Sequence, residues 1–195
     1  MAWLPLSPAM LPRLLASALV LGLAAPSFAQ TVSIDSVAVG GGGMGGRGAG
    51  PYTLFSLSQN RVVPNADSAS TSWDLGFRGT TVIVNGGTSG PGEGAAALVE
   101  TSFEDVDGAV ALVADGDGDC PRGEPLAVCT GSGNGWYLYA ENGVVPLPGR
   151  SLVVRLADGS GLAKVRFVSY TLSEPRPDGS RPRYYALDHE RLAGE

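Results

Sequence analysis

Short runs of apolar residues, either alternating with polar ones or rich in β-branched side chains, recur along the chain between clusters of turn-forming residues. Apolar residues at helical three-and-four spacing never continue for more than about two turns. A period of two is typical of strands, so the pattern predicts an all-β chain. We expect strands at residues 31–39, 52–58, 73–77, 80–84, 110–113, 136–139, 152–156, 162–172 and 183–187.

Three links between these runs have the composition of tight hairpins. They are Gln59-Asn60, Asn142-Gly143 and the segment DGSG at 158–161. Asn-Gly and Asp-Gly reach positive φ at little cost, as hairpin turns require. The sequence therefore predicts antiparallel hairpin and meander sheets in one domain. Residues 94–100, GAAALVE, are compatible with a short helix or a strand.

Alternation also assigns side chains to strand faces. In SWDLGF, it places Trp73, Leu75 and Phe77 on one face, which we expect to lie in the core. In WYLY, it places Tyr137 and Tyr139 together, opposite the tryptophan and the leucine. These two phenols are either exposed or line a groove.

The first residues have the layout of a secretory signal peptide. Arg13 precedes an apolar run, and a small-x-small site ends just before Gln30. The run is about ten residues, too short for a helix that crosses a bilayer, and no later run is longer. We expect a signal peptide at 1–29, an N-terminal strand and Gly-rich linker at 30–51, and a β domain at 52–195. The protein would then be exported, to the periplasm, the outer surface or the medium.

Charge and cysteine content narrow the class further. The chain has 13 Lys and Arg against 19 Asp and Glu, a net charge of -6, with its basic residues scattered. Nucleic-acid surfaces need clustered Lys and Arg, so we expect no nucleic-acid partner. Cys120 and Cys129 lie close together, and in an exported chain they predict a local disulfide. A metal or redox pair is the alternative, although no CxxC spacing supports it.

Two features that resemble catalytic or cofactor motifs have simpler explanations. Gly43, Gly45 and Gly48 match GxGxxG formally, but a strand-like segment follows where a dinucleotide site needs a helix. We interpret this run as a linker. His189 is the only histidine and lies near the end of the sequence, where we expect a solvated tail residue. Histidine-based catalytic arrangements are therefore incomplete, and we expect no enzymatic activity.

The acidic run DGDGDC places Asp115, Asp117 and Asp119 at alternate positions in a glycine loop. Calcium binds six to eight oxygens, which such carboxylates can supply together. An EF-hand loop starting at Asp115 would need Gly and Glu where this chain has Cys120 and Leu126. Two interpretations stay open, a solvated acidic loop and a structural calcium site.

Several segments in order resemble the HmuY family of exported bacterial haem-binding proteins. They are YTLFSLSQNRVV, ADSASTSWDLGFRGTTVIVNGGTSGPGEGAA and WYLYAENGVVPLPGRSLVVRLADGSGLAKVRFVSY, and together they span residues 52–172. The resemblance implies an all-β fold that holds haem, with two axial ligands that are histidines or, in some members, methionines. Where a first histidine is expected, this chain has Phe77-Arg78-Gly79, and Met44 is the only methionine after the signal peptide.

The resemblance thus implies a ligand-binding protein that holds haem, or another planar or apolar molecule, without bis-histidine ligation. Arg78 would pair with a carboxylate, and Tyr137 or Tyr139 would offer a ring or a phenolate. The alternative is a non-enzymatic structural or surface-interaction domain, stabilised by calcium at the acidic run, with a cell-surface or receptor partner.

Overall fold

The computed structural model describes residues 1, 30–39, 50–174 and 182–193. The predicted signal peptide, at 1–29, and the glycine run with its GxGxxG match lie outside the described residues, apart from their ends. The described chain is nearly all β, with antiparallel sheets in one domain, as the alternation predicts. None of its helices is long and apolar enough to cross a membrane.

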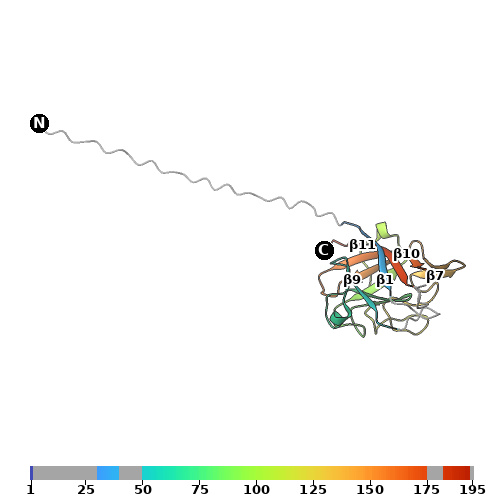
Figure 1. Cartoon of the computed structure of the whole chain (residues 1–195). Coiled ribbons are helices and arrows are strands. Elements are labelled where there is room, and N and C mark those ends of the chain that lie inside the picture. The colour runs from blue at the N-terminus through green and yellow to red at the C-terminus, as the bar shows by residue number, and fades with distance from the viewer. Residues whose placement is uncertain (2–29, 40–49, 175–181, 194–195) are drawn as a thin grey trace.

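The larger sheet has five antiparallel strands in the order β1-β11-β10-β9-β6. Figure 1 labels β1, β9, β10 and β11 of this sheet. The strand β1, near the start of the described chain, therefore pairs with β11, near its end. The strands are β1 (Val32–Val39), β6 (Ala95–Val99), β9 (Ser151–Arg155), β10 (Leu162–Leu172) and β11 (Arg183–Arg191).

The second sheet has four antiparallel strands in the order β3-β2-β4-β5. Gly79 and Thr80 alone connect β4 to β5, and Gly79 has a φ of +58°, which the first position of a type II′ hairpin turn requires. The connection between β4 and β5 is therefore a tight turn. The strands are β2 (Thr53–Ser56), β3 (Arg61–Val63), β4 (Leu75–Arg78) and β5 (Thr81–Val84).

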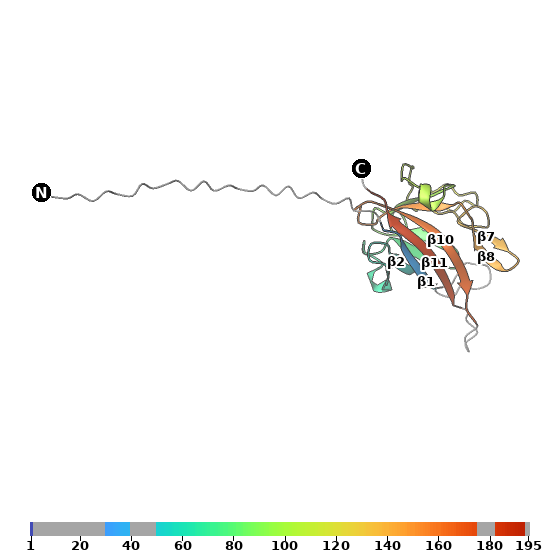
Figure 2. The same cartoon turned by 90° about the horizontal axis from the view of Figure 1, so that it is seen from above.

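A separate two-stranded hairpin consists of β7 (Tyr137–Ala140) and β8 (Gly143–Pro146). Figure 2 shows it at the periphery of the molecule, beyond β10. Two short 3-10 helices, η1 (Asn65–Asp67) and η2 (Phe103–Asp105), complete the regular structure of the described residues.

The main core lies between the two larger sheets. The four-stranded sheet contributes Phe55, Leu75 and Phe77, and the five-stranded sheet contributes side chains such as Val154 and Tyr185. A second cluster covers the opposite face of the four-stranded sheet, so β4 is buried on both faces. Its members are Leu54, Val63, Trp73 and Ile83. Trp73 is buried as expected, but in this second cluster rather than beside Leu75 and Phe77.

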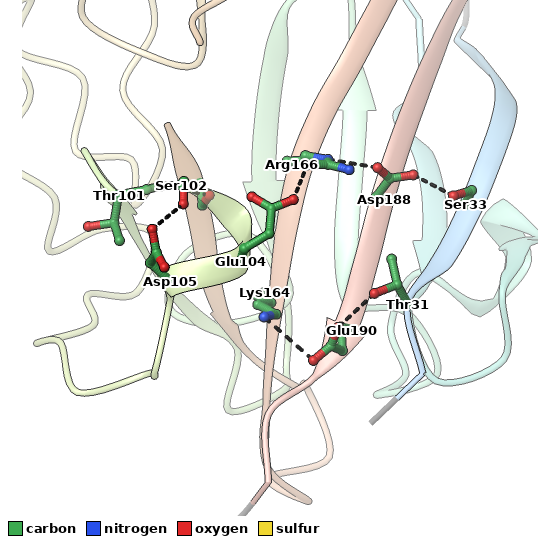
Figure 3. A network of polar contacts seen from close by, with 11 residues as sticks. Thr31, Ser33, Thr101, Ser102, Glu104, Asp105, Lys164, Arg166, Asp188 and Glu190 are labelled. Carbon is green, nitrogen blue, oxygen red and sulfur yellow. Dashed lines mark hydrogen bonds and ion pairs between the residues drawn. The ribbon is translucent and has the colours of Figure 1, made fainter. Parts of the chain in front are cut away.

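Charged side chains tie strands together on the other face of the five-stranded sheet (Figure 3). Arg166 Nε donates to Asp188 at 2.7 Å, across the β10-β11 pair, and its Nη1 donates to Glu104 of η2 at 2.6 Å. Asp188 also accepts a hydrogen bond from Ser33 of β1 at 2.6 Å. Although burial raises the pKa of Asp188, these hydrogen bonds outweigh it and the net shift is downward. The network fixes η2 and β1 on the sheet.

Three hairpin predictions are confirmed, at Gln59-Asn60, Asn142-Gly143 and 158–161. Within residues 94–100, Ala95–Val99 form the strand β6, so this segment is not a helix. The strand expected at 110–113 is wrong: Val110 N donates to Gly108 O in a turn, and only Val113 bridges to Ala96. The chain there runs beside β6 for one residue pair, too short for a strand.

The expectation of a solvated His189 is also wrong. The strand β11 continues to Arg191 instead of ending near Leu187, and His189 pairs with Val32 of β1 and Val165 of β10. Its side chain is 3% exposed. A strand between two others carries even a polar side chain into the interior when its face points there.

Candidate functional site

A pocket of about 340 Å³ opens beside the β4-β5 turn, and we call it the Arg78 pocket. The structure brings together in it the three residues that the sequence suggested for ligand binding, Arg78, Tyr137 and Tyr139. It adds residues that the sequence did not suggest, chiefly Tyr52, Arg122 and Glu124.

Arg78 is the last residue of β4, and its guanidinium is held against Tyr52. Its Cζ lies 4.1 Å from the centroid of the Tyr52 ring, and Nη2 donates to the Tyr52 hydroxyl at 3.0 Å. In the described part of the chain, no carboxylate lies within ion-pair distance of Arg78. Burial raises the pKa of Tyr52, although Arg78 lowers it, so the phenol stays neutral at neutral pH. The positive charge of Arg78 is therefore available to a bound anion.

Tyr137 and Tyr139 form an aromatic wall of the pocket. Alternation along β7 places them on one face, with ring centroids 5.3 Å apart and ring planes at 81°. The Tyr137 hydroxyl accepts hydrogen bonds from Thr80 Oγ1 at 3.1 Å and from Gly131 N at 3.2 Å. Burial raises the pKa of Tyr137, so its hydroxyl also stays protonated at neutral pH. Tyr137 is fixed and buried, whereas Tyr139 is 54% exposed.

The third wall comes from the loop that a disulfide closes. Cys120 and Cys129 form the predicted disulfide, with a Cα–Cα distance of 5.3 Å. The loop between them places Arg122 and Glu124 at the pocket. Arg122 Nε lies 3.7 Å from Glu124 Oε1, which also accepts a hydrogen bond from the Thr130 hydroxyl at 2.9 Å. Sequence reasoning missed both residues. The paired cysteines indicate a closed loop around them, but not which surface of the molecule this loop reaches.

The acidic run does not form a solvated loop throughout. Asp115 is fully buried, and its two carboxylate oxygens accept hydrogen bonds from Ala127 N at 2.8 Å and Val84 N at 3.0 Å. Burial raises the pKa of Asp115, although these hydrogen bonds lower it, and the net shift is upward. Asp117 and Asp119 are exposed. The described residues contain no group of three or more His, Cys, Asp or Glu that could hold a metal ion, so the three aspartates do not converge.

No protein-family model and no curated protein matches this chain. The resemblance to the HmuY family therefore rests on the sequence segments alone.

Proposed function

We propose that this is an exported, non-enzymatic ligand-binding protein of the HmuY family that binds a planar organic anion in the Arg78 pocket. The observation that carries the proposal is the guanidinium of Arg78, which is stacked on Tyr52 at the pocket wall without a carboxylate partner among the described residues. The disulfide is consistent with export, because such bonds persist in oxidising compartments.

The pocket combines charge with flat apolar surface. A guanidinium binds a carboxylate through two parallel hydrogen bonds, and Arg78 and Arg122 both line the pocket. The rings of Tyr137 and Tyr139 supply a surface for a planar group. A volume of about 340 Å³ lies at the small end of ligand sites, which run from about 300 to 1,000 Å³. Together these features favour an aromatic carboxylate.

Haem, which the resemblance implies, fits the pocket in part. Its propionates would form ion pairs with Arg78 and Arg122, and its ring would pack against the tyrosines. Haem iron in proteins takes His, Cys, Met or Tyr ligands, and here the side chains of that kind at the pocket are tyrosines. Tyr137 is a protonated phenol whose oxygen already accepts two hydrogen bonds, so it does not fit an axial ligand. The arginines of the pocket thus fit a carboxylate, whereas Tyr137 does not fit haem iron.

The test is a titration of the purified protein with 2-naphthoate, its neutral analogue 2-naphthamide, and haemin. We expect 2-naphthoate to bind and 2-naphthamide to bind at least tenfold more weakly, because a hydrogen bond between charged groups contributes about 1.5 to 3 kcal/mol. Arg78→Gln should remove this preference. Arg61→Gln is the matched control, since Arg61 is exposed on β3 and donates to Gln59 outside the pocket.

Equal affinity for the acid and the amide, or no effect of Arg78→Gln, would overturn the proposal. If haemin alone binds with a shifted Soret band, the ligand is haem. If none of the three compounds binds, the ligand-binding proposal is replaced by the second candidate function, a surface-interaction domain. The exposed cross-strand pair of Leu138 and Val145 on the β7-β8 hairpin supports that second candidate.

A further inference from the structure

A second hollow, of about 490 Å³, lies between the β7-β8 hairpin and the end of β10, and we call it the Leu172 groove. Val144, Tyr170 and Leu172 give it an apolar lining, and Arg183 lies among its lining residues. Tyr170 packs edge-on against Tyr185 at 5.0 Å, so one wall is anchored to the core.

The Leu172 groove and the Arg78 pocket are neighbours. Thr80 and Tyr139 line both of them. Thr80 is fixed, because its hydroxyl donates to Tyr137 and its carbonyl accepts from Trp136 Nε1 at 3.0 Å. Tyr139 is the half-exposed side chain at the junction. A ligand that passes the Tyr139 ring would occupy both hollows.

The two hollows differ in chemistry. The Arg78 pocket carries two arginines and one glutamate. Among its described lining residues, the Leu172 groove carries one charged side chain, Arg183, and otherwise offers mainly aliphatic and aromatic side chains beside Tyr139. Leu172 is itself half exposed, which costs free energy in water unless something covers it. The arrangement matches a molecule with an acidic aromatic head and an apolar tail.

We infer that the ligand is an elongated amphiphilic acid, with its carboxylate and ring in the Arg78 pocket and its apolar tail beyond Tyr139 in the Leu172 groove. This rests on the proposed function, since it extends the same site. Arg78 then selects the charge of the head, and the Leu172 groove selects the length of the tail.

The experiment compares 2-naphthoate with 6-hexyl-2-naphthoate by calorimetric titration. A methylene group moved from water into an apolar site improves affinity by about fourfold, so a partly buried hexyl tail should improve it by at least about tenfold. Leu172→Glu should abolish that gain and leave the affinity for 2-naphthoate within about twofold. Val168→Glu is the matched control, since Val168 lies on the same strand with similar exposure but outside both hollows.

Leu172→Ser serves as a second variant without a new charge, and circular dichroism checks the fold of each protein. The inference is overturned if the hexyl compound binds no tighter than 2-naphthoate, or if Leu172→Glu and Val168→Glu weaken it equally. In either case Arg78-dependent binding of 2-naphthoate would still support the proposed function. If neither acid binds, the proposed function fails, and this inference fails with it.

Discussion

At the scale of single residues, two buried aspartates organise the backbone. Asp74 accepts hydrogen bonds from Leu57 N at 2.8 Å and from Ala157 N at 2.9 Å, one on each carboxylate oxygen. Asp115 does the same for Val84 and Ala127. Each carboxylate thus joins segments that are distant in sequence and satisfies amides that would otherwise be buried without partners.

Asp115→Asn should therefore destabilise the protein by about 1 to 3 kcal/mol, because an amide NH₂ replaces one acceptor oxygen and leaves a backbone N–H unsatisfied. Urea unfolding at pH 7 measures the change. Asp117→Asn is the control, since this neighbouring side chain is exposed, and a change within about 0.5 kcal/mol is expected there. Equal effects of the two substitutions would contradict the structural role of Asp115.

Asn85 explains why the segment that follows it, residues 86–94, is rich in glycine. Its side-chain amide donates to the carbonyls of Ser70 and Trp73, at 2.8 Å each, and accepts from Gly92 N at 3.1 Å. A methyl group at Gly90 would overlap the Asn85 side chain. The run is glycine-rich because backbone packs around a buried asparagine, and it opens no helix that could hold a phosphate.

His189 gives stability a specific dependence on pH. In the part of the chain that the structure describes, its buried Nε2 has no hydrogen-bond partner. Burial lowers the pKa of His189, although Asp188 beside it raises the pKa. The unfolded chain therefore binds a proton at higher pH than the folded one, and stability falls as pH drops below about 6.5.

His189→Leu should remove that part of the pH dependence. We expect the unfolding free energy of the unsubstituted protein to decline between pH 7 and pH 5 more steeply than that of the variant. Each unit of pKa depression corresponds to about 1.4 kcal/mol. Comparing the two proteins separates His189 from the carboxylates, which titrate in both. Parallel curves of stability against pH for the two proteins would contradict this, because they would mean that the His189 imidazole has the same pKa in the folded and the unfolded chain.

At the scale of elements, the sequence pattern predicted the structure correctly where two paired strands are joined by a short turn. The β9-β10 hairpin follows from alternation and DGSG, and β10 has the predicted bounds 162–172. The sequence pattern did not predict the structure where pairing with a strand distant in sequence determines it. Pairing with β9 makes residues 95–99 a strand, and the position between β1 and β10 extends β11 to Arg191.

The residues of the candidate site also fall into those that the sequence predicted and those that only the structure shows. Tyr137 and Tyr139 follow from alternation on one strand, and Arg78 follows from the sequence resemblance. Arg122 and Glu124 lie in a loop without periodicity, so only the folded path of the chain shows that they reach the pocket.

The disulfide should therefore affect binding as well as stability. Replacing both Cys120 and Cys129 with serine should lower the unfolding free energy by about 2 to 3 kcal/mol. It should also weaken 2-naphthoate binding several-fold, because the wall that carries Arg122 loses its anchor. Reductant should reproduce both effects in the parent protein and change nothing in the variant. An unchanged affinity would mean that hydrogen bonds, among them those of Thr130 with Glu124 and of Ala127 with Asp115, hold this wall without the disulfide.

At the scale of the whole molecule, the fold is closed by strands from opposite ends of the described chain. The strand β11 is inserted between β1 and β10, so the five-stranded sheet is incomplete until the last strand is in place. Tyr185 and Leu187 of β11 are fully buried in the main core, and Tyr185 packs on Phe77 of the other sheet at 4.8 Å. Contacts this distant in sequence predict slow folding, in milliseconds to seconds.

A chain truncated after Pro182 should therefore fail to fold, whereas one truncated after Arg191 should fold. The first lacks β11, which leaves β1 without its partner, opens an unpaired edge on β10 and removes Tyr185 and Leu187 from the core. The second keeps β11 and loses, among the described contacts, the hydrogen bond from Leu192 N to Leu162 O. Near-ultraviolet circular dichroism and thermal unfolding distinguish the two. A cooperative transition in the shorter chain would mean that the other four strands and the four-stranded sheet form a sufficient core, and that β11 completes the fold without being required for it.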